Sequence, residues 1–173
     1  MATVKVTYAS AEEERRWNHL SNLMNSFHQW FKDEFKRIYE SADGSFANRG
    51  LSLSQYLSTV TSFNASLTMH HTMEERHVFP ILAQGIPKFA SSTHGGHIDS
   101  HREIHDGLEN LAQKVTKWTE DPTMYSPMEM KISLEALSNV LFSHLDQEVE
   151  DIRGDNLKPY FTLDVIESIG KGV

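Results

Sequence analysis

The sequence predicts an all-α fold, an antiparallel four-helix bundle in up-down-up-down order with a short helix in its C-terminal tail. Four long segments carry apolar residues at the helical period, and capping signals or loops rich in Gly and Ser separate them. No segment alternates convincingly as a strand, and the connections are short enough to join neighbouring helices. The 173 residues suit one domain, 1–173, with a bundle core at about 10–153 and a tail at 154–173.

The helices follow from these signals in chain order. We expect long helices over about 10–41, 52–84, 98–119 and 126–153, and a short one over about 163–169. The start signals are two capping boxes and a capped proline, which are Ser10 with Glu13, Ser52 with Gln55, and Ser126 with Pro127 and Glu129. The first helix has an apolar stripe made of Leu20, Met24, Phe27, Phe31, Phe35 and Ile38. The second carries Pro80 near its end, and Gly170 closes the short one.

The composition restricts the partners of the protein. A net charge of −8 argues against nucleic acid or an anionic membrane as the main partner. The absence of cysteine excludes disulfides, thiolate zinc sites and iron–sulfur clusters, and it fits a reducing compartment. The sequence contains no apolar core of signal-peptide length near its start and no apolar run long enough to span a bilayer. We therefore expect a soluble, cytoplasmic protein, and its oligomeric state stays open.

Five histidines and two glutamates form a candidate metal site, and they are spread over the four long helices. They are His28, the pair His70 and Glu74, the pair His101 and His105, and the pair His144 and Glu148. The i, i+4 spacing of each pair places both side chains on one helix face. A lone histidine is more often a hydrogen-bonded core residue, and a lone His/Glu pair is usually solvated. Because burying several such groups is costly without a cation, their convergence from four helices predicts a metal site.

The helical register distinguishes two overlapping pairs in the second helix, His70/Glu74 and His71/Glu75. Residues seven apart nearly superimpose on a helix, and the lines through His70 and Glu74 contain mainly apolar residues. The competing lines contain polar residues, namely Thr61, Asn64 and Thr68. We therefore expect His70 and Glu74 to face the core and His71 and Glu75 to lie toward a flank. His71, Glu75 and Glu150 are expected to be surface groups or groups that surround the ligands.

The remaining histidines lie outside the candidate ligand set. His94 and His97 lie in a Gly-rich connection, and we expect them to be solvated. His19 is half a turn away from His28 around the helix axis and should point elsewhere. His77 lies one turn past the glutamate of the second helix on the ligand face. Two interpretations of His77 stay open, a packed core residue or a residue around the metal site.

The ordered motifs resemble those of the hemerythrin family of non-haem di-iron proteins. A histidine in the first helix, "HHTMEERHVFP", HxxxH and "HLDQE" follow one another, and the resemblance covers about residues 15–152. It implies two iron ions bridged by an oxide or hydroxide and by two carboxylates. Carried over by position, it assigns His28 and His70 to one iron, His101, His105 and His144 to the other, and Glu74 and Glu148 to the bridges. The chain departs from oxygen-carrying members, which have Asp one position later than Glu148.

This ligand set favours a reactive site. It leaves one position open if both irons are octahedral, on the iron held by His28 and His70. An open position predicts binding of O2 or another small ligand, and hence an oxygen-binding or oxygen-sensing protein. Two alternatives stay open: a di-iron oxidase, peroxidase or oxygenase acting on a small molecule, and iron storage or iron sensing. Val140 and Leu141, one turn before His144, are expected to wall the small-ligand pocket.

Overall fold

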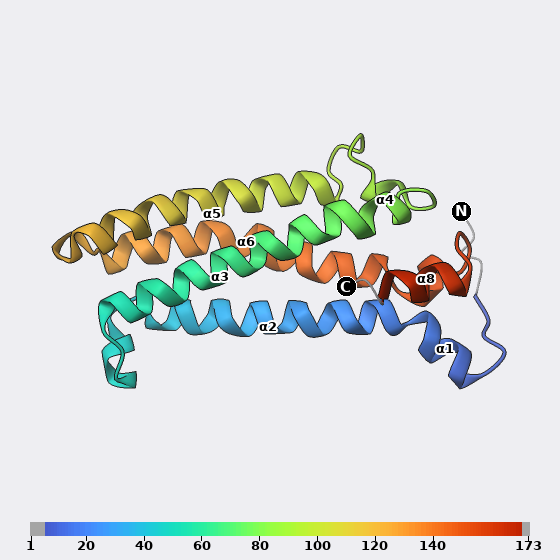
Figure 1. Cartoon of the computed structure of the whole chain (residues 1–173), viewed down its shortest axis with the longest axis horizontal. Helices are drawn as coiled ribbons and strands as arrows, with labels where there is room; N and C mark the ends of the chain where they lie inside the picture. Colours follow the sequence, from blue (N-terminus) through green and yellow to red (C-terminus); the bar gives the residue numbers. More distant parts are fainter. Residues whose placement is uncertain (1–5, 171–173) are drawn as a thin grey trace.

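The computed structural model describes residues 6–170, and these residues form helices and no strand. Its four long helices are α2 (His19–Ser41), α3 (Leu53–Met73), α5 (His97–Glu120) and α6 (Pro127–Asp151). They lie side by side in a bundle (Figure 1), with contacts between α2 and α3, α3 and α5, α5 and α6, and α6 and α2. This confirms the predicted all-helical class. The ends of the expected domain, 1–5 and 171–173, lie outside the described residues.

The capping signals in the sequence act as predicted at the starts of the long helices. The Ser52 hydroxyl accepts from the Gln55 backbone N–H at 3.2 Å, and the Gln55 side chain accepts from the Ser52 N–H at 2.8 Å. The Ser126 hydroxyl accepts from the Glu129 N–H at 3.2 Å. These bonds satisfy backbone donors that have no partner within the first turn of a helix, and they determine where α3 and α6 begin.

The first expected helix is divided in two by Asn18. Helix α1 (Ala11–Trp17) ends there, and α2 begins one residue later. The Asn18 side chain accepts from the backbone N–H of Gly154 at 3.0 Å, so it joins this break to the start of α7 (Gly154–Leu157). A Cβ at Gly154 would lie 2.8 Å from the Cβ of Trp17, and only glycine allows this approach. The tail contact therefore accompanies a bend that helical periodicity alone did not predict.

The second expected helix continues to its predicted end but changes its winding. A π-helical segment, η2 (Glu74–Val78), follows α3 and leads into α4 (Phe79–Leu82), which contains Pro80 near its start. A π-helical turn holds an extra residue, so the positions beyond it are shifted by one on the helix face. Leu82 is consequently fully buried, and Ile81 is half-buried. An uninterrupted α-helix would instead place Ile81 on the inner face, in line with Glu74.

Short elements complete the described chain. They are η1 (Ser45–Arg49), η3 (Pro87–Phe89), η4 (Pro122–Met124) and α8 (Leu163–Gly170). The predicted short helix in the tail is α8, which packs on α1 and α2 beside one end of the bundle (Figure 1). Its Ile166 and Ile169 are buried. No helix within residues 6–170 is long and apolar enough to cross a membrane.

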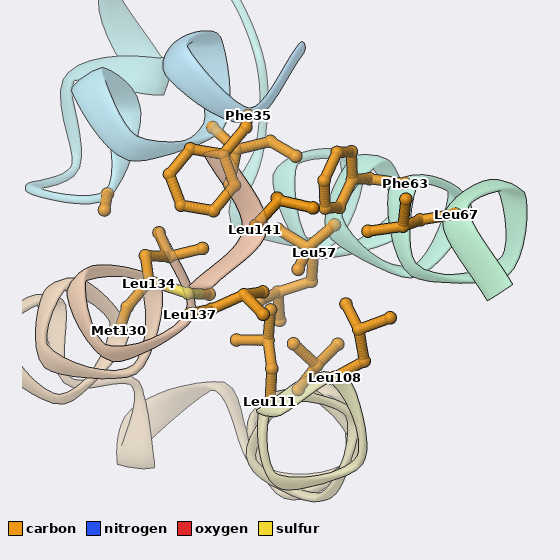
Figure 2. Packing of buried hydrophobic residues seen from close by; sticks show 14 of the residues in the cluster. Phe35, Leu57, Phe63, Leu67, Leu108, Leu111, Met130, Leu134, Leu137 and Leu141 are labelled. Atoms are coloured by element: carbon orange, nitrogen blue, oxygen red, sulfur yellow. The ribbon is translucent and has the colours of Figure 1, made fainter. Parts of the chain in front are cut away.

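Two apolar clusters occupy the interior. The first fills the half of the bundle next to the α2–α3 and α5–α6 connections, and Figure 2 shows part of it, including Phe35, Phe63, Leu108 and Leu137. The second lies toward the opposite end, where α1, α4 and α8 cover the long helices. Its members include Trp17, Met24, Val78, Leu82, Ile152 and Ile166. The candidate metal site lies in the layer between these two clusters.

Candidate metal centre

A buried layer of histidine and glutamate side chains separates the two apolar clusters. On α2, His28 lies between Met24 of the second cluster and Phe31 of the first. On α6, Glu148 lies between Leu145 of the first cluster and Ile152 of the second. The same helical period that builds the apolar core therefore points these polar side chains into it. We call this set of side chains the histidine–glutamate layer.

One half of the layer is formed by α2, α3 and the first residue of η2. The Nε2 atoms of His28 and His70 are 3.1 Å apart, and Oε1 of Glu74 lies 2.9 Å from His70 Nε2. His28 Nδ1 donates to the backbone carbonyl of Leu145 at 2.8 Å. In the neutral ring this leaves a lone pair on Nε2, which faces the other two ligand atoms. His28, His70 and Glu74 thus form a group that could hold a metal ion.

The other half is formed by α5 and α6. The Nε2 atoms of His101 and His144 are 3.0 Å apart. Oε2 of Glu74 lies 3.6 Å from His101 Nε2, and Oε2 of Glu148 lies 3.3 Å from His144 Nε2. Glu148 also lies 3.9 Å from His28 Nε2. Each glutamate therefore contacts histidines of both halves, as a bridging carboxylate would.

Glu75 orients one of these histidines from outside the layer. Its Oε1 accepts from His101 Nδ1 at 2.8 Å, although 38% of the Glu75 side chain is exposed. A carboxylate bonded to the outer nitrogen of an imidazole turns the inner nitrogen toward a metal and makes it a better donor. This position agrees with the expectation that Glu75 lies at the surface or around the ligands. Glu150 is exposed and pairs with Arg153, also as expected.

The pKa values of the two buried glutamates are shifted in opposite directions. Burial, reinforced by the charge of Glu74, raises the pKa of Glu148 to about 7. Burial also acts on Glu74, but its interactions with His28 and His70 outweigh it and hold the pKa of Glu74 well below its usual value. Without a cation, the layer therefore favours one carboxylate and one carboxylic acid, because two buried like charges repel each other.

Most histidines of the layer favour the neutral form that a metal requires. Burial lowers the pKa of His101 to about 2 and that of His144 to about 4, and it holds the pKa of His71 well below the usual value. His70 is different: burial alone would lower its pKa, but the adjacent Glu74 raises it. Neutral imidazole and carboxylate are ligands suited to divalent and trivalent transition metals.

Several polar atoms of the layer lack the partners that burial normally demands. Oε2 of Glu74, both oxygens of Glu148, both ring nitrogens of His71, and Nδ1 of His144 are enclosed without a hydrogen-bond partner. No lysine or arginine within the described residues pairs with either glutamate. Unsatisfied buried acceptors and carboxylates are costly. A metal cation fits here because it would satisfy these lone pairs and balance the carboxylate charge.

The structure places His71 and His105 differently from the expected ligand pattern. His71 was expected toward a flank, but it is fully buried and forms a possible metal-binding group with Glu74, His101 and His144. His105 is half-buried, contacts the His71 ring edge-on at 5.4 Å, and belongs to none of the three groups.

The polar residues on the helix face of His71 do not mark a flank exposed to solvent. The Asn64 amide donates to the Leu108 carbonyl on α5 at 2.7 Å, so this face of α3 points toward a neighbouring helix. Polarity on the line therefore marked an interhelical contact, which single-helix periodicity cannot distinguish from contact with solvent. The burial of His71 corrects the expectation that it lies toward a flank.

His77 lies on the outside of the protein. The π-helical segment shifts the register by one residue, so that Val78 is buried in the second apolar cluster and His77 is exposed. The interpretation of His77 as a packed core residue is wrong, and its exposure places it away from the buried layer. His19 is also exposed, in agreement with the expectation that it points elsewhere.

His97, by contrast, is buried although a solvated position was expected. Its Nε2 lies 3.1 Å from Oδ2 of Asp151, and its ring centroid lies 5.5 Å from that of His144. Burial lowers the pKa of His97. The connection before α5 folds over the end of the bundle, and Phe89 stacks on the His97 ring at 4.5 Å. His94 is fully exposed, as expected.

Polar residues between α5 and α6 surround a pocket that reaches the layer at His144. The pocket has a volume of about 450 Å³, and Val140 lines it. Leu141 is fully buried in the first apolar cluster (Figure 2). The expected open coordination position lies on the opposite half, beside His28 and His70, whereas this pocket approaches the half that contains His144.

Comparison with known proteins agrees with this site. A family model described as the hemerythrin HHE cation binding domain matches residues 19–152. A curated relative, the "Dimeric xanthone biosynthesis cluster protein R11" of Cryptosporiopsis sp. (strain 8999), is 30% identical over 89 residues. The match covers 50% of this chain and 32% of that protein, so the chain spans about a third of the relative's length. No solved structure matches the chain significantly.

Proposed function

Because the chain belongs to the hemerythrin HHE cation-binding domain family, we propose that its histidine–glutamate layer holds two iron ions and binds O2 or a related small ligand. The observation that carries the proposal is the sharing of ligands between three possible metal-binding groups. Glu74 belongs to two of these groups, and His144 also belongs to two. Shared ligands of this kind favour two neighbouring ions over one isolated ion.

The proposed ligand set differs in one residue from the one that the motifs imply. His28 and His70 hold one ion, His101 and His144 hold the other, and Glu74 and Glu148 lie between them. We place His71 in the set instead of His105, because both nitrogens of His71 are buried without a partner. The helices that supply these residues run alternately up and down in the proposed bundle.

Iron suits this site on chemical grounds. Imidazole and carboxylate ligands bind iron well, and a pair of iron ions supplies electrons for binding or reducing O2 when it is present. The protein contributes the geometry: the Leu145 carbonyl orients His28, and Glu75 orients His101. The apolar clusters on either side restrict water, which protects a reactive metal site from side reactions.

A second candidate function is a di-iron oxidoreductase that acts on a small organic molecule. The 450 Å³ pocket at His144 favours this alternative, because it is larger than a diatomic ligand requires. The name of the curated relative associates that protein with a dimeric xanthone biosynthesis cluster. Under this alternative the same ligands hold the metal, and the pocket receives the substrate.

One experiment separates these functions. The iron-loaded protein is reduced without oxygen, exposed to air, and followed by its optical absorption. Absorption that appears with air and disappears under vacuum supports reversible O2 binding. Rapid irreversible oxidation supports oxidase chemistry or iron handling, and turnover of an added organic reductant then distinguishes those two. Failure to bind iron at about two ions per chain would contradict the proposal itself.

A further inference from the structure

Four polar side chains form a connected network beside the histidine–glutamate layer. The Lys88 ammonium donates to both carboxylate oxygens of Asp151, at 2.9 and 3.0 Å. The Gln147 amide donates to Oδ1 of Asp151 at 3.0 Å, and His97 Nε2 lies 3.1 Å from Oδ2. Asp151 thus accepts from three neighbours, which holds its carboxylate in one orientation. The proposed iron ligands do not include any of these four residues.

The network determines which nitrogen of His97 carries the proton. An ionised carboxylate only accepts hydrogen bonds, so Nε2 of His97 is the protonated nitrogen that donates to Asp151. The lone pair of the neutral ring is then on Nδ1. This atom is not among the enclosed polar atoms that lack a partner. Phe89 stacks on the ring, so its orientation is restrained from a second direction.

His97 and His144 both line the pocket between α5 and α6. Lys88 lies at its outer part with 54% of its side chain exposed, whereas the side chains of His97 and His144 are nearly fully buried. The pocket therefore extends from solvent, past the network, to a residue of the layer. Its volume of about 450 Å³ is within the range of small-molecule sites.

We propose that this pocket binds a small organic molecule bearing a hydroxyl group, and that Nδ1 of His97 accepts the hydrogen bond from that hydroxyl. His97 lines the pocket, and a lone pair on its ring selects a hydrogen-bond donor. Two carboxylates, those of Glu103 and Asp151, also line the pocket, and the only lysine there is paired with Asp151. The charge of the lining therefore disfavours an anion, and we assign the pocket to a neutral alcohol or phenol.

This inference deepens the proposed function, on which it rests for the metal beside the pocket, but the contact with His97 does not require the metal. Phenol and its methyl ether, anisole, are a suitable pair of probes because they differ in the hydroxyl proton. Binding is measured by calorimetry to the zinc-loaded protein, in which the metal is redox-inactive, and to the metal-free protein. We expect phenol to bind at least about tenfold more tightly than anisole.

The variants test the network directly. Asp151→Asn replaces one of the two acceptor oxygens by an amide donor and so disturbs the contact that orients His97. It should reduce phenol affinity about tenfold while leaving anisole affinity unchanged. Glu103→Gln is the matched control, because this residue lines the same pocket outside the network, and it should leave the phenol preference intact. If Asp151→Asn does not fold, Lys88→Gln at the half-exposed end provides a milder change with the same expected direction.

Nitrogen NMR of labelled histidine provides a readout that a purely structural role would not change. His97 should carry its proton on Nε2, and phenol should shift the Nδ1 resonance whereas anisole should not. A proton on Nδ1, or equal affinity for phenol and anisole, overturns the inference. Failure of iron to load at about two ions per chain contradicts the proposed function separately, because the phenol preference is also measured in the metal-free protein.

Discussion

The imidazole rings of His71 and His101 are stacked, with their centroids 3.9 Å apart and their planes 12° apart. His71 comes from α3 and His101 from α5, so the contact joins two neighbouring helices inside the histidine–glutamate layer. Stacked neutral rings pack well, but neither nitrogen of His71 has a hydrogen-bond partner. The pair therefore accounts for the packing of His71 and leaves its lone pair without a role unless a cation is bound.

Replacing His71 and His105 in turn tests which histidine completes the metal site. We expect His71→Leu to weaken metal binding by on the order of 10- to 100-fold or more, because a ligand should matter at least as much as a group that orients one. His105→Leu should retain the iron content of the parent protein. Metal analysis after dialysis against a chelator measures both. Loss of iron from His105→Leu alone would restore the ligand set implied by the motifs.

Glu74 and Glu75 are adjacent acids with different expected roles. Glu74→Gln should lose most of the bound iron, because Glu74 contacts histidines of both halves. Glu75→Gln should keep about two iron ions per chain, with affinity lower by roughly 10- to 100-fold through the less well oriented His101. Iron content and chelator competition measure the two effects. Equal loss of iron from both variants would contradict the bridging role of Glu74.

The stability of the metal-free protein should rise between about pH 4.5 and 6.5. In this window the unfolded chain keeps protons on His71, His101 and His144, whose ordinary pKa is 6.5, and loses the proton of Glu148, whose ordinary pKa is 4.5. Folding reverses both, because burial lowers the three histidine pKa values and raises that of Glu148 to about 7. The unfolded state therefore binds more protons, and raising the pH favours folding.

Each net proton in this window changes the free energy of unfolding by about 1.4 kcal/mol per pH unit. Urea unfolding of the metal-free protein at several pH values measures this slope. Between pH 4.5 and 7 Glu148 partly opposes this rise, because at this group the folded state binds one proton more than the unfolded state. Above about pH 7 the contributions of the histidines and of Glu148 are both complete, and the profile should level off. A flat profile between pH 4.5 and 6.5 would show that these histidines are not held neutral in the fold.

The register shift after Glu74 predicts a difference between two adjacent apolar residues. Leu82→Ala should lower the free energy of unfolding by about 2–5 kcal/mol, as expected for a fully buried leucine. Ile81→Ala should cost clearly less, because Ile81 is half-buried. Denaturant unfolding of the two variants under identical conditions gives the comparison. The reverse order would indicate an uninterrupted α-helix and would return His77 to the inner face.

Much of the fold and the site could be predicted from local sequence alone. Capping residues determine where α3 and α6 begin, and the apolar period indicates α5, because both signals act within one or two helical turns. The same local geometry brings His70 next to Glu74 and His144 next to Glu148, since residues four apart share a face. These pairs can therefore be predicted without knowledge of the rest of the chain.

The sequence by itself determined the helices, the i, i+4 pairs and the family resemblance. The tertiary structure decided the rest, because it depends on which helix faces which. The burial of His71 follows from the contact of α3 with α5. The burial of His97 follows from the connection before α5, which brings Phe89 onto its ring, and from its contact with Asp151 of α6. His77 is exposed because one extra residue in a π-helical turn rotates everything after it. A prediction from periodicity assumes that each helix is unbroken and has a single inner face. The π-helical segment contradicts the first assumption, and the contact of Asn64 with α5 contradicts the second.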